Sequence, residues 1–224
     1  MVRVLGLDLS PNMIRSATER YSSATTEFRV VDCRFLHRDG GDDIAGSFDK
    51  VISNAALHWI LRCPETRIQT LKAIHAALRP GGAFAFEMGG HGNIPEMHTA
   101  FIAVLVRRGV SLVDAQDAAP WFFPSEAWMR HTLTGIGFDV QTLETEYRPT
   151  KLKANSDDPT AGLAGWARLM GACFLDVLSP DPDIREDIVQ EVCALVKPVV
   201  TRIEDGTVWL GYVRLRGIAV RKSG

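Results

Sequence analysis

The stretch Val4-Leu-Gly-Leu-Asp-Leu-Ser-Pro-Asn-Met-Ile14 decides the fold class. Its first half is a short apolar run that ends in an acid, a pattern typical of a buried strand. Ser10 and Pro11 then form a strong helix start, because serine can cap free N–H groups and proline fits the first helical turn. The stretch therefore predicts a strand over residues 3–9 that is followed directly by a helix.

Strands and helices continue to alternate along the first part of the chain. Further strands are expected at residues 28–32, 48–54 and 83–88. Before the last of these, Ile68, Leu71, Ile74 and Leu78 recur at helical spacing, and Arg79-Pro-Gly-Gly82 ends that helix. This alternation predicts an α/β fold with a doubly wound, mostly parallel sheet, whose ligands bind at the carboxyl ends of the strands.

The pattern changes after Gly89-Gly-His-Gly92. Helices are predicted over residues 95–107, 125–135, 160–178 and 183–197, and strands over 138–147 and 208–220. The two late strands are expected to form an antiparallel edge of the sheet. Because no repeat, low-complexity segment or linker interrupts the chain, we predict one domain over residues 1–224.

The composition of the chain narrows the range of possible functions. The chain of 224 residues has 25 Lys and Arg against 27 Asp and Glu, a formal charge of −2, which argues against nucleic-acid binding. No apolar run approaches the ~20 residues of a membrane span, and an early acid argues against a signal peptide. The four cysteines Cys33, Cys63, Cys173 and Cys193 lack metal-ligand spacing, so no metal site and a cytoplasmic location are expected.

Three segments together resemble the class I S-adenosylmethionine-dependent methyltransferases: residues 4–14, Phe48-Asp-Lys-Val-Ile-Ser-Asn-Ala-Ala-Leu-His-Trp59, and Leu78-Arg-Pro-Gly-Gly-Ala-Phe-Ala-Phe86. The resemblance implies a Rossmann-like fold and S-adenosyl-L-methionine as cofactor, bound by residues 1–92. It also implies roles for individual residues. Asp8, with Ser10 in the turn, binds the ribose hydroxyls; Asp32, beside Cys33, takes the adenine amino group; and Asn54 meets the methionine moiety.

A narrower resemblance concerns the methyl acceptor. Ser53-Asn-Ala-Ala-Leu-His-Trp59, Leu163-Ala-Gly-Trp-Ala-Arg168 and Tyr212-Val-Arg-Leu-Arg216 resemble the trans-aconitate methyltransferase group, which shares its architecture with malonyl-carrier-protein methyltransferases. This implies O-methylation of a small carboxylic acid, with residues 93–224 on the substrate side. A carboxylate is already ionised at neutral pH, so no catalytic base is expected. The candidate substrate residues are His58, Trp59, Trp166, Arg168 and Arg214.

One departure from the family leaves alternatives open. The Asp/Glu-x-Gly-x-Gly-x-Gly strand that begins the family, and that lies in the middle of its sheet, is missing from the sequence. Either an upstream segment was lost from the sequence or the protein is a remnant, so an inactive protein that acts through binding is the alternative function. A third possibility is a phenol or amine acceptor, with His58 as the base. Asp8 can also be read as a helix cap, and Trp166 or Arg168 as packing or surface residues. The oligomeric state is left open.

Overall fold

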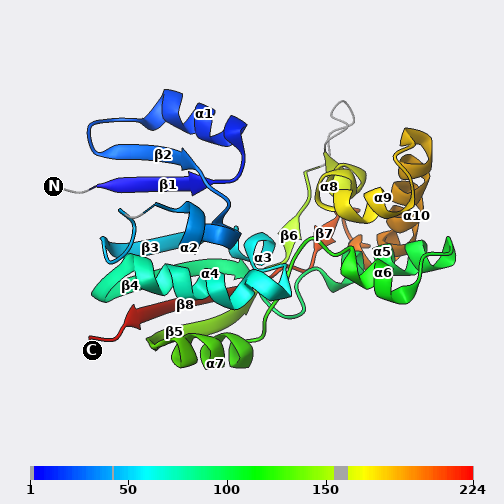
Figure 1. Ribbon diagram of the computed structural model, residues 1–224. Helices are drawn as coiled ribbons and strands as arrows, with labels where there is room; N and C mark the ends of the chain where they lie inside the picture. Colours follow the sequence, from blue (N-terminus) through cyan, green and yellow to red (C-terminus); the bar gives the residue numbers. More distant parts are fainter. Residues whose placement is uncertain (1–2, 42, 154–160, 224) are drawn as a thin grey trace. The chain divides into compact units, whose positions relative to one another are not determined.

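Alternating strands and helices run through the computed structural model, which describes residues 3–41, 43–153 and 161–223 (Figure 1). The first elements are β1 (Val4–Asp8), α1 (Pro11–Tyr21), β2 (Thr26–Val30), a 3₁₀ turn (Cys33–Phe35), α2 (Leu36–Asp39), β3 (Phe48–Asn54), α3 (Leu57–Ile60), α4 (Pro64–Ala77) and β4 (Leu78–Gly89). They are followed by α5 (Pro95–Arg107), α6 (Leu112–Asp117), α7 (Glu126–Ile136), β5 (Phe138–Tyr147), β6 (Thr150–Lys151), α8 (Gly162–Met170), α9 (Ala172–Leu178), α10 (Pro182–Val200), β7 (Trp209–Leu210) and β8 (Val213–Arg221).

The chain divides into two units. The first unit comprises residues 1–87, 127–143 and 216–224, and the second comprises residues 88–126 and 144–215. The first unit therefore takes in two late segments that the sequence grouped with residues 93–224. β8 pairs with the early strand β4, and β5 extends the same sheet beyond β8. Such pairing cannot be read from position in the chain.

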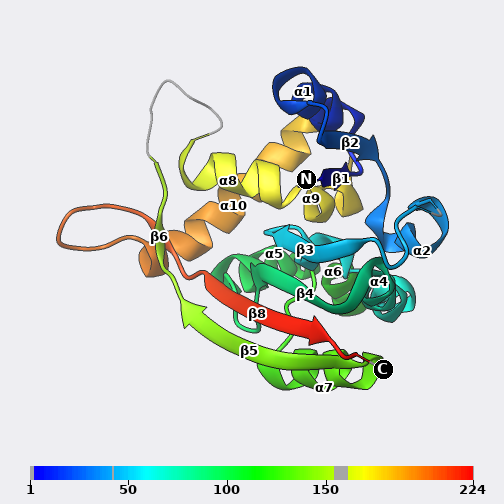
Figure 2. The same ribbon diagram turned by 90° about the vertical axis from the view of Figure 1, so that its left-hand side faces the viewer.

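The strands of the first unit form two separate sheets. β1 and β2 pair in parallel, with Asp8 opposite Val30, and β3, β4, β8 and β5 form a second sheet in that order. β3 and β4 are parallel, whereas β8 and β5 run in opposite directions (Figure 2). The predicted α/β fold with an antiparallel edge is thus confirmed, and all four early strands lie close to their predicted positions.

Two strand boundaries differ from the prediction. β2 ends at Val30 and not at residue 32, because the Asp32 side chain accepts the Arg34 N–H and caps a 3₁₀ turn. β4 begins at Leu78, so residues 79–82 lie inside the strand and not in a turn before it. The register moves there from Phe48–Leu78 to Lys50–Ala83, an irregularity that takes up the extra residues.

The second unit is built around buried aromatic rings. Phe101 of α5 and Phe174 of α9 stack with ring centroids 4.8 Å apart. Gly171 lies between α8 and α9 at this point, and a Cβ atom there would approach the Phe101 ring within 2.2 Å. The predicted single helix over 160–178 is therefore two helices, and residue 160 itself lies outside the described residues.

The predicted strand 208–220 is also divided. β7 pairs with β6 in an antiparallel fashion, and β8 begins only at Val213. Between them the Gly211 N–H donates to the Glu96 carboxylate at 2.7 Å. The carbonyl of Tyr212 accepts the backbone N–H of Arg148 at 2.7 Å. The backbone of this break is therefore held by other parts of the second unit.

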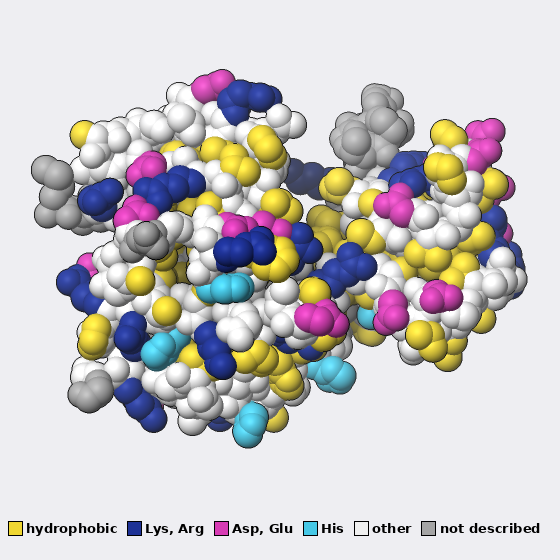
Figure 3. All heavy atoms as spheres, in the orientation of Figure 1, with side chains coloured by type: hydrophobic (Ala, Val, Ile, Leu, Met, Phe, Trp, Pro, Cys, Tyr) yellow, Lys and Arg dark blue, Asp and Glu magenta, His cyan; other side chains and the backbone are white. Residues whose placement is uncertain are grey.

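The surface carries both signs of charge. On the face shown in Figure 3, basic and acidic side chains are interspersed, as a formal charge of −2 leads one to expect. None of the helices in the described part of the chain has both the length and the apolar character needed to cross a membrane.

Candidate functional site

Asp8 ends β1 with an exposed carboxylate. Its Oδ1 accepts the Ser10 N–H at 2.7 Å, and the Ser10 hydroxyl accepts the Met13 N–H at 3.3 Å to cap α1. Asp8 Oδ2 has no hydrogen-bond partner among the residues that the structure describes. The carboxylate is thus oriented by the turn and still has acceptor capacity for hydroxyl groups.

Asp32 lies close to Asp8, because the Val31 N–H donates to the Asp8 carbonyl at 3.0 Å. Unlike Asp8, it is paired: the Arg34 guanidinium contacts both carboxylate oxygens, with Nη2 2.6 Å from Oδ2. This hydrogen-bonded pair lowers the pKa of Asp32 below its ordinary value. Asp32 is therefore a fixed anion, and any ligand amino group must share its oxygens with Arg34.

Cys33 sits beside both acids and is half-buried. Burial is the main cause that raises the pKa of its thiol to about 11, and the negative charges of Asp32 and Asp8 add to the effect. At neutral pH the thiol is protonated, so Cys33 offers a compact apolar contact and not a nucleophile. The residues that the structure describes contain no group of three or more His, Cys, Asp or Glu side chains suited to a metal ion.

The carboxyl ends of β3 and β4 carry a further polar group. Asn54 is exposed at the end of β3, in register with Glu87. Ala55 follows in the left-handed region at φ 53° and donates its N–H to the Glu87 carbonyl at 2.8 Å. The Glu87 carboxylate pairs with Arg216 at 2.6 Å. We did not predict the Glu87–Arg216 pair, although an acid at the end of a strand was the signal that singled out Asp8.

His58 and Trp59 lie on the short helix α3. The imidazole of His58 is buried, Trp59 is 37% exposed, and the two ring centroids are 5.4 Å apart. Both residues therefore follow the end of β3 by only a few positions in the chain. Their contact with a substrate stays a prediction.

Trp166 and Arg214, two of the predicted substrate residues, meet at Tyr212 in the second unit. The indole N–H of Trp166 donates to the Tyr212 hydroxyl at 2.7 Å. The Arg214 guanidinium lies over the Tyr212 ring, 4.6 Å from its centroid. Burial raises the pKa of Tyr212, so its hydroxyl stays neutral. We call Trp166, Tyr212 and Arg214 the aromatic–arginine group; it presents a cation on a fixed aromatic platform.

Arg168 is placed differently. Its guanidinium binds Glu186 of α10 through two hydrogen bonds of 2.8 Å, so it joins α8 to α10. These bonds are the largest cause that lowers the pKa of Glu186, to about 2, and Gln190 contributes as well. The partner of Arg168 in these bonds is thus Glu186 of α10, which lies outside the aromatic–arginine group.

The Arg168–Glu186 pair should make stability depend on acid pH. The pKa of Glu186 falls from an ordinary 4.5 to about 2 on folding, so its contribution is present above pH 4.5 and is lost as the pH falls toward 2. Because both side chains are more than a third exposed, Glu186→Gln should cost less than about 1 kcal/mol at pH 7. Urea unfolding at pH 7 and near pH 2 tests this, and an equal difference at both pH values would contradict it.

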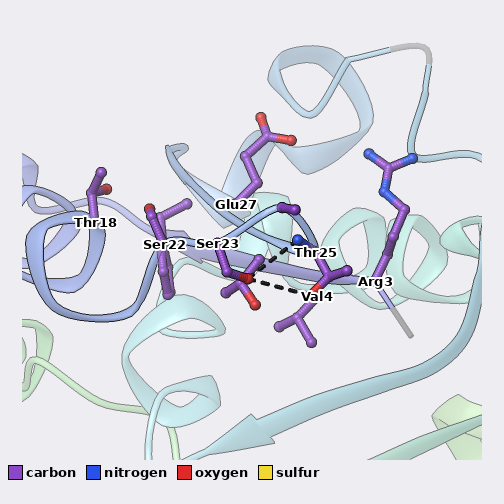
Figure 4. A pocket seen from close by; sticks show the side chains of 10 residues that line it. Arg3, Val4, Thr18, Ser22, Ser23, Thr25 and Glu27 are labelled. Carbon is purple, nitrogen blue, oxygen red and sulfur yellow. Dashed lines mark hydrogen bonds between the residues drawn. The ribbon is translucent and has the colours of Figure 1, made fainter. Parts of the chain in front are cut away.

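A cavity of about 340 Å³ opens at the other end of β1 and β2 (Figure 4). It is lined by Arg3, Val4, Thr18, Glu27 and the hydroxyl-bearing turn at 22–26. In this turn the Ser23 hydroxyl accepts the Thr25 N–H at 3.2 Å. Because ligands of parallel sheets bind at the carboxyl ends of strands, this cavity is not the expected cofactor site.

Comparison with protein families and curated proteins gives a consistent result. Residues 1–84 match a family described as a methyltransferase domain. An uncharacterized methyltransferase of Schizosaccharomyces pombe is 33% identical over 217 residues, which are 97% of this chain and 77% of that protein. A malonyl-[acyl-carrier protein] O-methyltransferase of Paenibacillus is 34% identical over 107 residues, 46% of this chain and 36% of that protein.

Solved structures support the fold. The YcgJ protein from Bacillus subtilis superposes with a TM-score of 0.59, at 10% sequence identity, over 99% of this chain and 83% of that protein. At this identity the likeness concerns the fold alone. It agrees with the α/β sheet and its antiparallel edge.

Proposed function

We propose that this chain, which belongs to the S-adenosylmethionine-dependent methyltransferases, transfers the methyl group to the carboxylate of a small acid. The observation that carries the proposal is the aromatic–arginine group, which offers a guanidinium to an anionic acceptor. The relative from Paenibacillus is named for O-methylation of a malonyl group, which also ends in a carboxylate. Trans-aconitate and a malonyl thioester are therefore the acceptors to test first.

The cofactor residues belong to the first unit. S-adenosylmethionine supplies an electrophilic methyl group on a positively charged sulfur. Asp8 accepts hydrogen bonds from the two ribose hydroxyls, because its exposed carboxylate is oriented but not consumed by the turn. Asp32 and Cys33 contact the adenine ring from the next strand end, with Arg34 holding the Asp32 carboxylate in place. Asn54 provides an amide at the methionine moiety.

The proposed acceptor residues need to position the substrate carboxylate, and they do not need to activate it. A carboxylate is ionised at neutral pH, so no side chain has to remove a proton before methyl transfer. Arg214 orients the acid through paired hydrogen bonds, and Tyr212 and Trp166 keep the guanidinium fixed. Transfer neutralises opposite charges, so the aromatic surroundings favour it by limiting water. In the first unit, His58 and Trp59 on α3 remain candidate substrate residues.

The proposed acceptor class can be tested by turnover. With S-adenosylmethionine at millimolar concentration, methyl transfer should be measured to trans-aconitate, to a malonyl thioester and to a primary amine of similar size. We expect methyl esters from the acids and no product from the amine. Methylation of the amine without methylation of either acid would contradict the proposal.

Arg214 should control acid binding. Arg214→Ala should weaken binding of trans-aconitate about tenfold, equivalent to about 1.4 kcal/mol, because a charge-assisted contact is lost. Arg202→Ala is the matched control, since Arg202 also lies over an aromatic ring in the same unit, 3.9 Å from the centroid of the Trp209 ring. Titration calorimetry gives the two constants, and equal weakening by both changes would remove Arg214 from the site.

A further inference from the structure

Three polar side chains form a row across neighbouring strands of the first unit. Asn54 ends β3 and lies in register with Glu87 of β4. The Arg216 guanidinium of β8 donates through Nε to the Glu87 carboxylate at 2.6 Å. β3, β4 and β8 are neighbours in one sheet, and Figure 2 shows them side by side. We call Glu87 and Arg216 the strand-end pair.

The alternation of side chains along β4 and β8 turns the strand-end pair away from the core. Phe86 and Met88, on either side of Glu87, are buried, and so is Leu215 next to Arg216. Because successive side chains of a strand point to opposite faces, Glu87 and Arg216 lie on the face opposite these apolar residues. The Glu87 side chain is 30% exposed and the Arg216 side chain 32%. A ligand can therefore reach both charged groups.

The backbone beside the strand-end pair is held in an uncommon conformation. Ala55, directly after Asn54, has a φ of 53°, in the left-handed region that non-glycine residues rarely adopt. Its N–H donates to the Glu87 carbonyl at 2.8 Å. Such strain persists only where the surrounding structure holds it, and it clusters at binding and active sites. Since a partly exposed ion pair adds little stability, the arrangement indicates a binding role for the pair.

The strand-end pair also lies where a methyl acceptor has to bind. Under the proposed function, Asp8 and Asp32 hold the ribose and the adenine ring, and Asn54 meets the methionine moiety. Figure 1 shows β1 and β2 on the side of β3 that faces away from β4 and β8. The reactive methyl group is on the sulfur next to the methionine moiety, so its acceptor must lie beside Asn54. The strand-end pair is on that side of the proposed cofactor site.

We propose that Glu87 and Arg216 select small acids that carry a hydroxyl group on the carbon next to a carboxylate. Arg216 donates to the carboxylate, and the hydroxyl group donates to Glu87. An acid without this hydroxyl brings its carboxylate close to Glu87 with no hydrogen bond to offset the repulsion. The selection rests on the proposed function, because it takes a small acid as the methyl acceptor.

An amino group is a less suitable donor at this position than a hydroxyl group. An ammonium group could also donate to Glu87, but it would carry its positive charge close to the Arg216 guanidinium, which is bound to the same carboxylate. A hydroxyl group has no net charge and meets no such repulsion. We therefore expect the strand-end pair to distinguish hydroxy acids from amino acids as well as from unsubstituted acids.

Three acids with the same carbon skeleton test this selection. Malate carries a hydroxyl group, aspartate carries an ammonium group at the same carbon, and succinate carries neither. Titration calorimetry with S-adenosylhomocysteine at millimolar concentration gives the dissociation constant of each acid. We expect malate to bind at least about tenfold more tightly than succinate or aspartate, the usual effect of a hydrogen bond to a charged group.

Variants separate the roles of the two side chains. Glu87→Gln keeps the shape of the side chain and removes its charge, so malate should bind less tightly and succinate more tightly, to within about twofold of each other. Arg216→Gln should weaken binding of both acids about tenfold, because it removes the guanidinium that holds the carboxylate. Glu27→Gln is the matched control, since Glu27 pairs with Arg29 at 2.6 Å on another strand of the same unit. It should leave the ratio of the two constants unchanged.

Equal binding of malate and succinate by the unsubstituted protein would overturn the proposal, and this measurement depends on no variant. Tighter binding of aspartate than of malate, or binding of neither malate nor succinate, would also overturn it. So would an unchanged ratio in Glu87→Gln or an unchanged affinity in Arg216→Gln. Methyl ester formation tests the proposed function separately. Esters formed from malate and succinate without preference would leave acid methylation standing and would overturn the selection alone.

Discussion

Replacing Asp8 by asparagine should weaken binding of S-adenosylhomocysteine about 10- to 150-fold, equivalent to about 1.5–3 kcal/mol for hydrogen bonds to a charged group. Asparagine keeps an oxygen that can accept the Ser10 N–H, so the turn into α1 is preserved. It loses the charge and the second acceptor that the ribose hydroxyls require. Titration calorimetry on both proteins under the same conditions gives the ratio of the constants.

Asp39→Asn provides the control for the Asp8 variant. Asp39 is another exposed acid of the first unit, and it pairs with its neighbour Arg38 at 2.6 Å. The change removes the same charge without touching the strand end, so it should leave cofactor binding within a factor of about two. An unchanged constant for Asp8→Asn would remove Asp8 from the cofactor site.

Replacing Phe101 by alanine should lower the free energy of unfolding by about 3–5 kcal/mol, the usual cost of removing a buried aromatic ring. Phe101 is fully buried, stacks on Phe174 with an interplanar angle of 5°, and fills the space beside Gly171. Gly171 cannot fill the cavity left behind. Urea unfolding monitored by tryptophan fluorescence measures the loss, because Trp121 and Trp166 belong to the same buried cluster.

Val199→Ala is the matched control for packing. Val199 is an apolar residue of α10 in the same unit, but it is 77% exposed, so its truncation should cost no more than about 0.5 kcal/mol. If Phe101→Ala cost no more than Val199→Ala, the assignment of Phe101 to the core would be wrong.

The strand ends show most clearly how far the candidate cofactor site could be predicted from the sequence. The apolar runs that end at Asp8 and Asn54 are local signals, because a buried strand and a helix cap each depend on a few consecutive residues. Both positions were therefore predictable without an alignment. The pairing of Asp32 with Arg34 was missed, although it is also local, because it depends on which rotamers the 3₁₀ turn allows.

The proposed acceptor residues show the opposite case. Trp166 and Tyr212 are 46 residues apart, and their hydrogen bond exists only once α8 and the segment before β8 pack together. Arg168 and Arg214 looked alike in the sequence, since each is a cation close to an aromatic residue. Packing placed Arg168 against Glu186 and Arg214 over Tyr212. Such a distinction depends on distant partners that no local pattern contains.

By itself, the sequence determined three features: the alternation of strands and helices, the parallel pairing of neighbouring early strands, and the acids close to the strand ends. These features follow from hydrophobic periodicity and capping, which act over a few residues. Only the tertiary structure decided that residues 216–221 join the first unit beside β4 and that Glu87 pairs with Arg216. It also decided that, in the part of the chain that the structure describes, the strands β1 and β3 belong to separate sheets. Each of these depends on contacts between segments far apart in the chain, whose geometry exists only after the backbone has folded.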